Sequence, residues 1–181
     1  MKRLLLLRHA KACRERHGLD DIDRTLTDRG RADAIRMGHF LKEEKCVPEV
    51  VLCSPAARTR QTLELILPVL EDTPAVQSVR ELYLAKASKI VEIVRQTRTA
   101  AGSLMIVGHN PGLEYCARTL ARMPGGSESR KLYDAMSQKF PTAALAVIGF
   151  EIAEWDGIEP GAGELELFVR PKDLSGEADD N

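Results

Sequence analysis

The sequence predicts an α/β fold in which helices cover both faces of a mostly parallel central sheet, and three observations lead to this prediction. Residues 4–7 are four consecutive leucines between charged residues, a run too short for a helix that buries one stripe but suited to a strand covered on both faces. Two further apolar runs of strand length follow at residues 49–53 and 104–107. Segments with apolar residues at helical spacing lie between these runs, as in βαβ units.

Length and composition narrow the class of protein further. A chain of 181 residues with 44% hydrophobic residues can bury one core and is short for two, so we expect a single domain over residues 1–173. The net charge of −1 lacks the basic excess that is typical of nucleic-acid-binding proteins, so we expect no nucleic-acid partner. The leucine run is too short for a signal peptide or a membrane span, and the cysteines show no C-x-x-C spacing. We therefore expect a cytoplasmic protein with reduced cysteines and no membrane partner.

The segment after the first strand predicts a loop followed by a helix. Residues 11–24 are too charged for a core element and are expected to form a loop or a short helix over the sheet edge. Thr27 is expected to cap a helix that runs to about Lys45, with Asp28 at the positive end of the helix dipole. The apolar residues expected on this helix are Ile35, Met37, Phe40 and Leu41.

Two X-Pro sequences directly after apolar runs predict further helix starts. Ser54 is expected to cap a helix that begins with Pro55, and Arg58 lies in or just past the first turn of that helix. In the same way, Asn110 is expected to cap a helix that begins with Pro111. The same arrangement of strand, polar residue and helix start therefore occurs twice.

The rest of the chain gives weaker signals. The expected elements are a strand at 76–79, helices at 87–98 and 113–121, and strands at 143–150 and 164–169 that form a hairpin at one sheet edge. Residues 123–141 show no regular pattern and include a loop at 124–127. Residues 174–181 are acidic and without periodicity, which predicts a disordered tail.

Polar residues follow the strand ends, which is where open α/β sheets bind their ligands. They are Arg8, His9, Arg58 and His109, with Glu81 as a carboxylate after the weak third strand. Two arginines and two imidazoles beside free helix amides favour an oxyanion such as a phosphoryl group. Plainer explanations stand beside this one: Arg8 and His9 can simply close a strand, while Arg58 and Glu81 can be surface residues.

The same residues make a poor metal site. Two cations beside the histidines repel a divalent ion, and the H-x-x-x-H and H-E-x-x-H spacings are missing from the sequence. The Walker pattern G-x-x-x-x-G-K-[ST] is missing as well. We therefore expect neither a bound metal nor a cofactor.

Three motifs follow the apolar strands of this chain. They are Arg8-His9-Ala10 after the leucine strand, Ser54-Pro55-Ala56-Ala57-Arg58-Thr59-Arg60-Gln61-Thr62, and Gly108-His109-Asn110-Pro111. Together they resemble the motifs of the histidine phosphatase superfamily. The short chain, without a large insertion between the second and third motifs, is most similar to the SixA-type phosphohistidine phosphatases. This resemblance implies a three-layer α/β/α fold like that of phosphoglycerate mutases. In one departure, Ala10 stands where much of the superfamily has glycine, and we expect the turn to survive because alanine is small.

The resemblance also implies a role for each site residue. His9 would attack phosphorus and carry the phosphoryl group. The phosphoryl oxygens would be bound by Arg8, Arg58, His109 and Asn110. Glu81 occupies the place where many members of the superfamily carry their acid, so it would protonate the leaving group and later activate water. A phosphoramidate substrate needs less of this help, because a protonated imidazole already leaves easily.

The function expected from this resemblance is removal of phosphate from protein phosphohistidine through a covalent phosphohistidine intermediate. A phosphatase or mutase acting on a small phosphorylated metabolite is one alternative, and a noncatalytic phosphate-binding module is another. The chain has no large cap, which favours an open site for a protein surface. His17 and His39 are not expected in the site, and Thr142 either lines its mouth or starts a strand.

Overall fold

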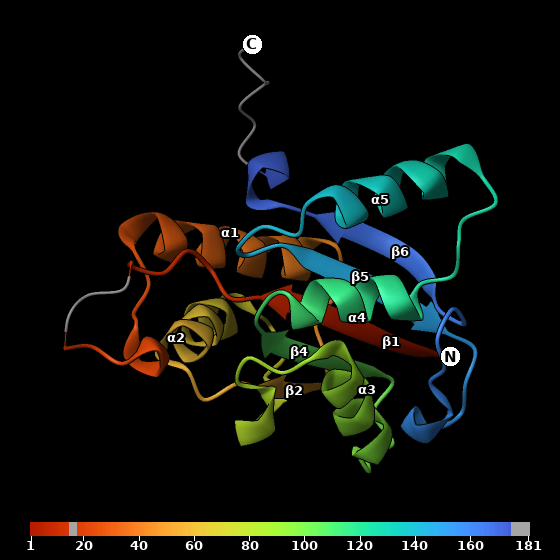
Figure 1. The fold of residues 1–181 in the computed structure, drawn as a ribbon, viewed down its shortest axis with the longest axis horizontal. Coiled ribbons are helices and arrows are strands. Elements are labelled where there is room, and N and C mark those ends of the chain that lie inside the picture. The colour runs from red at the N-terminus through yellow and green to blue at the C-terminus, as the bar shows by residue number, and fades with distance from the viewer. Residues whose placement is uncertain (15–17, 175–181) are drawn as a thin grey trace.

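The computed structural model describes residues 1–14 and 18–174, and a six-stranded sheet crosses them in the order β3-β2-β4-β1-β5-β6 (Figure 1). The strands are β1 (Lys2–Arg8), β2 (Val50–Cys53), β3 (Ala75–Ser78), β4 (Ser103–Gly108), β5 (Leu145–Phe150) and β6 (Glu164–Val169). Strands β3, β2, β4 and β1 pair in parallel, whereas β5 is antiparallel to both of its neighbours. The prediction of a mostly parallel sheet is therefore confirmed, and β1 lies in its interior.

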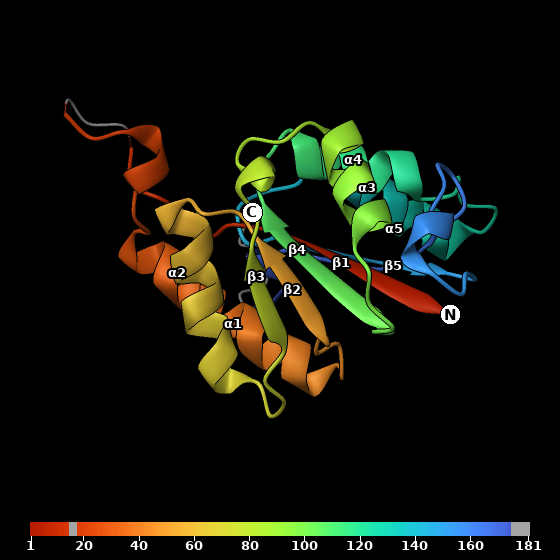
Figure 2. The same cartoon turned by 90° about the horizontal axis from the view of Figure 1, so that it is seen from below.

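Helices cover both faces of this sheet (Figure 2). One face carries α1 (Asp28–Glu43) and α2 (Ala57–Ile66), and the other carries α3 (Ala87–Gln96), α4 (Gly112–Leu120) and α5 (Ser127–Gln138). Side chains alternate along β1, so Leu5 and Leu7 pack in the core under α1 and α2, while Leu4 and Leu6 pack in the core on the other face. All four leucines are buried, as expected for a strand covered on both sides.

Helix α1 begins where the sequence predicts, but the set of apolar residues that it buries differs from the predicted set. The Thr27 hydroxyl oxygen accepts a hydrogen bond from the backbone N–H of Gly30 at 3.1 Å, which is the expected cap. The helix ends at Glu43 rather than at Lys45. Ile35 is 39% exposed, because the helical repeat turns it away from the sheet. The buried apolar residues of this helix are Ala34, Met37 and Leu41.

The predicted caps of the two X-Pro helices are wrong. Helix α2 begins at Ala57 and α4 at Gly112, and neither has a side-chain cap. The Ser54 hydroxyl bonds the buried His109 ring and accepts from the Ala56 amide before α2, and the Asn110 amide donates to the Phe140 carbonyl. Both side chains are thus engaged by tertiary contacts at the carboxyl end of the sheet.

Helix α5 lies in the segment where the sequence predicts no regular element. Met136 is the one buried residue of this helix. Leu132, Tyr133 and Ala135 are only partly buried against the core. A contact stripe this narrow gives a weak periodic signal, because most positions of the helix are polar and exposed.

The end of the described chain matches the prediction in part. The expected hairpin is confirmed, since β5 pairs with β6 in antiparallel at the sheet edge. Leu174 does not belong to a tail, because it ends a 3₁₀ helix (Pro171–Leu174) and packs against the core. Residues 175–181 of the predicted tail lie outside the described residues, and the single domain over 1–173 stays a prediction. In the described parts of the chain, no helix has both the length and the apolar character needed to cross a membrane.

Leu5→Ala and Ile106→Ala should each lower the free energy of unfolding by about 2–5 kcal/mol, because each truncates a side chain buried in one of the two cores. Chemical denaturation measures this change. Val76→Ala is the matched control, since Val76 is 46% exposed and its substitution should stay within about 0.5 kcal/mol. A neutral effect of either core substitution would contradict the burial of β1 and β4.

Candidate active site

Two histidines stand side by side because the strands that precede them are parallel neighbours in register. Arg8 of β1 pairs with Gly108 of β4, so His9 and His109 follow at the same edge of the sheet. Their ring centroids are 5.2 Å apart with the ring planes tilted by 55°, and both side chains are buried. Arg58, in the first turn of α2, is 3% exposed and acts electrostatically on both rings. The structure thus brings together the four residues that the motifs single out.

His9 is held as a neutral imidazole with one nitrogen available for reaction. Its Nδ1 lies 2.8 Å from the carbonyl oxygen of Ala10, and a carbonyl only accepts, so Nδ1 carries the proton. The second nitrogen, Nε2, therefore keeps its lone pair. Burial lowers the pKa of His9 to about 4, and the positive charges of Arg58 and Arg8 act in the same direction. Near neutral pH, His9 Nε2 could therefore act as a nucleophile without first losing a proton.

Ala10 fits the turn after β1, as expected. Its side chain is fully buried, and its φ is not among the positive values, which in the described chain fall at Lys45, Leu84 and Ala143 for residues other than glycine. The backbone N–H of Ala10 donates to the Thr62 hydroxyl at 2.9 Å. A glycine is not needed here, because the backbone does not enter the left-handed region.

His109 is a second buried imidazole with a lowered pKa. Burial is the main cause, followed by the neighbouring His9 and Arg58, and together they bring the pKa to about 3. The Nε2 atom lies 2.8 Å from the Ser54 hydroxyl. Within the described chain, Nδ1 is buried and has no hydrogen-bond partner. This arrangement explains why Ser54 does not cap α2, since its hydroxyl orients His109.

Arg8 and Asn110 share one backbone acceptor. Arg8 Nη1 donates to the carbonyl of Phe140 at 2.7 Å, and Asn110 Nδ2 donates to the same oxygen at 3.0 Å. Asn110 Nδ2 also lies 3.0 Å from Glu114 Oε2. Arg8 Nε and Asn110 Oδ1 are buried without partners among the described residues, so each retains hydrogen-bonding capacity. The loop before β5 thus fixes both side chains at the site.

The structure adds Asp21 and Tyr83, which the sequence analysis does not single out. Arg58 Nη1 donates to the Asp21 carbonyl at 2.6 Å, and Nη2 donates to the Asp21 carboxylate at 2.9 Å. The Tyr83 hydroxyl donates to that carboxylate at 2.6 Å, and the Tyr83 ring stands edge-on to His109 at 5.5 Å. Hydrogen bonds from Tyr83 and from the arginines Arg24 and Arg58 hold the pKa of Asp21 far below its usual range.

Asp21 lies in a charged loop in which neighbouring residues are also acidic, so spacing alone does not distinguish it. Asp21 reaches Arg58 only because the loop between β1 and α1 passes the start of α2. The sequence feature that comes closest to predicting Asp21 is Arg58, because an arginine that is buried in the fold requires an acidic partner.

Glu81 is not brought to the other four residues. It is exposed in a 3₁₀ helix (Arg80–Leu82) and lines a groove together with Lys89 and Glu92 of α3. Within the described chain, no hydrogen bond or ion pair joins it to the arginines or histidines of the site. A position after a strand end does not decide which way a side chain points.

The remaining predicted positions fall as follows. Thr142 lines a groove that also includes Arg8, and it does not start a strand because β5 begins at Leu145. His39 is exposed on α1, away from the site, whereas His17 lies outside the described residues. No group of three or more histidine, cysteine or acidic side chains in the described segments is placed to hold a metal ion.

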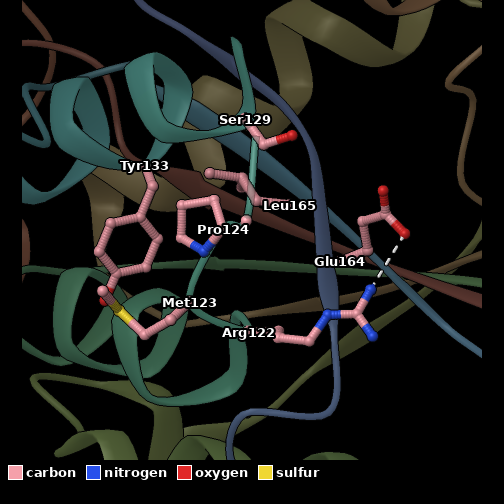
Figure 3. A pocket seen from close by; sticks show the side chains of 8 residues that line it. Arg122, Met123, Pro124, Ser129, Tyr133, Glu164 and Leu165 are labelled. Atoms are coloured by element: carbon pink, nitrogen blue, oxygen red, sulfur yellow. Dashed lines mark hydrogen bonds and ion pairs between the residues drawn. The ribbon is translucent and has the colours of Figure 1, made fainter. Parts of the chain in front are cut away.

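Figure 3 shows a small hollow at the start of β6, and none of the site residues lines it. Arg122 and Glu164 form an ion pair of 3.4 Å at its rim, and Tyr133 and Met123 lie along its other side. Its volume of about 90 Å³ is well below the roughly 300 Å³ at which ligand pockets begin. We therefore assign no ligand to it.

Comparison with known proteins agrees with the motifs. The sequence profile of the histidine phosphatase superfamily (branch 1) matches residues 4–99. An uncharacterized protein of Mycobacterium tuberculosis is 33% identical over 166 residues, which cover 92% of this chain and 100% of the relative.

Solved structures give the same assignment. The structure of SixA from Nakamurella multipartitia, named as a phosphohistidine phosphatase, has a TM-score of 0.80 at 28% identity and covers 94% of this chain and 96% of its own. SixA from Agrobacterium tumefaciens, named in the same way, has a TM-score of 0.77 at 28% identity and covers 94% and 98%. The chain therefore belongs to the histidine phosphatase superfamily, and within it to the SixA type.

Proposed function

We propose that this protein removes phosphate from phosphohistidine in other proteins through a phosphohistidine intermediate of its own at His9. The observation that carries the proposal is the 2.8 Å contact of the buried His9 Nδ1 with the Ala10 carbonyl, which assigns the proton of the neutral ring to Nδ1 and leaves Nε2 its lone pair. Nε2 is thus presented as a nucleophile beside two arginines. The names of the two SixA structures support phosphohistidine as the substrate. A cytoplasmic location, expected from the sequence, belongs to the same proposal.

The first step transfers the phosphoryl group to this chain. The Nε2 lone pair of His9 attacks phosphorus, the new N–P bond forms, and the P–N bond to the substrate imidazole breaks. Arg8, Arg58 and His109 bind the three phosphoryl oxygens and stabilise the charge that is spread over them. The site needs no movement of the His9 proton, because Nδ1 keeps it throughout.

The second step regenerates the enzyme. A water molecule attacks the phosphorus of phospho-His9, the N–P bond breaks with its electron pair returning to Nε2, and inorganic phosphate leaves. Asp21 and Tyr83 act on these steps through Arg58, since their bonds fix the orientation of the guanidinium group.

The leaving group of the first step is an imidazole, and this bears on Glu81. An imidazole that is already protonated by solvent departs without an acid from the protein, which agrees with a Glu81 side chain that is exposed outside the cluster. The alternative substrate, a small phosphomonoester, has an alkoxide leaving group that requires a proton. The role of Glu81 as general acid stays a prediction.

Incubation with a phosphohistidine peptide, followed by a rapid quench at alkaline pH and mass spectrometry, should show one phosphate adduct that maps to His9. His9→Ala should give neither adduct nor released phosphate, because it lacks the nucleophile. Turnover that depends on His9 without a trapped adduct means that the intermediate decays before the quench. Release of phosphate by His9→Ala at the wild-type rate would contradict the proposal, and no release by wild type would favour a noncatalytic phosphate-binding module.

Glu81→Gln should change phosphohistidine turnover by less than about threefold, because solvent supplies the leaving-group proton. The same variant with a phosphomonoester separates the two substrate classes. A loss of about 10²-fold or more on both substrates would establish Glu81 as the general acid and would overturn this expectation.

Protonation of His9 should make the stability of the protein fall in mild acid. The unfolded chain protonates this residue near its ordinary pKa of 6.5, whereas the folded chain resists protonation until about 4. The unfolded state therefore binds more protons in this window, and the free energy of unfolding falls as pH falls through it.

Urea denaturation of wild type and His9→Asn at about pH 7 and about pH 4.5 tests this dependence. The wild type should lose roughly 1–3 kcal/mol more than the variant between these two conditions. Equal losses would contradict a neutral buried His9.

A further inference from the structure

The groove that Thr142 lines adjoins the site at Arg8, and most of its charged lining is cationic. We call it the basic groove; its volume is about 750 Å³, and the cations that line it are Arg8, Lys11, Arg29, Lys139, Arg170 and Lys172. They come from the end of β1 and the loop that follows it, the first turn of α1, the end of α5 and the segment after β6 that includes the 3₁₀ helix. Segments far apart in the sequence thus contribute positive charge to one cavity of a chain whose net charge is −1.

Acidic groups neutralise only part of this charge. Asp33, the acidic residue in the lining, is buried and already bonds Arg36 at 2.9 Å, with Arg29 at 3.8 Å. Arg170 is bonded to Asp173. Lys11 and Lys139 are exposed and form no ion pair within the described chain. The groove therefore keeps a positive potential that attracts anions.

The groove adjoins the candidate active site at Arg8. Arg8 belongs to both, and its buried Nε has no partner among the described residues. Lys11 follows His9 in the same loop, and Thr142 of the lining precedes Ala143, whose N–H donates to the His9 carbonyl at 3.0 Å. A substrate with its phosphoryl group at His9 therefore has the groove directly beside it.

The size and chemistry of the groove favour one kind of anion. Its volume lies within the range of roughly 300–1,000 Å³ that holds a whole ligand or a short chain segment, and exceeds the space that one phosphate needs. Exposed lysines are flexible point charges, which suit several dispersed carboxylates better than one planar group. The lining contains no aromatic residue on which a nucleobase could stack.

We propose that the basic groove binds acidic side chains that flank the phosphorylated histidine of a polypeptide substrate. The inference rests on the proposed function for the position of the phosphoryl group. It assigns to Arg29 and Lys139 the recognition of substrate charge, separate from the chemistry at His9. Complementary charge at exposed positions increases the rate of association and selects partners, and salt weakens both effects.

The test compares two phosphohistidine peptides that differ only in their flanking residues, glutamate in one and glutamine in the other. The groove variant carries Arg29→Gln with Lys139→Gln. The matched control carries Arg31→Gln with Lys131→Gln, which removes the same charge from exposed positions on α1 and α5 that do not line the groove. The measured quantity is the ratio of kcat/KM for the acidic peptide to that for the neutral one, so general effects on turnover cancel.

We expect the wild-type ratio to exceed one and to fall by about two- to tenfold in the groove variant, because exposed ion pairs are individually weak. The change should appear in KM and should diminish at high salt. The control variant should keep the wild-type ratio. A wild-type ratio of one, or an equal fall in both variants, would overturn the inference.

Binding measurements separate this inference from the proposed function. Fluorescence anisotropy of the same peptides on the His9→Ala chain reports recognition without turnover. Selective binding of the acidic peptide that requires Arg29 and Lys139 supports the groove even if the wild type releases no phosphate. Turnover that shows no preference for the acidic peptide would contradict the inference about the groove and leave the proposed function standing.

Two competitors distinguish the source of the anion. A small bisphosphate that binds through Arg29 and Lys139 when the acidic peptide does not would assign the groove to a second phosphate of a metabolite. An oligonucleotide that binds there more tightly than the acidic peptide would assign it to nucleic acid. Either result overturns the assignment to a polypeptide.

Discussion

Parallel pairing of β1 with β4 is the constraint on which the site depends. It sets Arg8 opposite Gly108, so the residues that follow, His9 and His109, leave the sheet together and meet within 5.2 Å. Leucine side chains fill both faces of β1, and a slip of one residue would move Arg3 or Arg8 into a position that a buried leucine occupies. The positions of the two imidazoles are therefore set by the pairing of an apolar strand.

Burial then determines what these imidazoles can do. Removing them from water lowers the pKa of each, and the nearby guanidinium groups lower it further. In water an imidazole would be partly protonated near neutral pH and would lose its nucleophilic lone pair in that fraction. Hydrogen bonds to the loop carbonyls of Ala10 and Phe140 and to the Ser54 hydroxyl offset part of the energetic cost of this desolvated cluster.

The parts of the fold that could be predicted are those that depend on local pattern. Leucine runs, the Thr27 cap and the alternation of strands and helices located most of the sheet and its order of elements. The motifs likewise located Arg8, His9, Arg58 and His109, because their distance from a strand end is fixed along the chain.

Prediction failed where a side chain chooses between a local and a distant partner. Ser54 and Asn110 look like caps in sequence, but His109 and the Phe140 carbonyl compete for them successfully. Asp21 reaches Arg58 across a long loop, which no spacing rule describes. The face on which Glu81 lies depends on the path of the chain after β3, and helix α5 is held by too few apolar contacts to produce a period. These features arise from tertiary contacts, so they become visible only in the structure.

The bonds between Asp21 and Arg58 also bear on how the product departs. A pocket with two unengaged arginines would hold inorganic phosphate strongly, and its slow escape would limit each catalytic cycle. Asp21 bonds both terminal nitrogens of Arg58 and offsets part of its charge, and its carboxylate would repel a phosphate dianion bound beside it. A transition state with charge spread over the phosphoryl oxygens would suffer less from this repulsion than the product. A carboxylate beside an anion site thus shifts the balance from retention of phosphate towards its release.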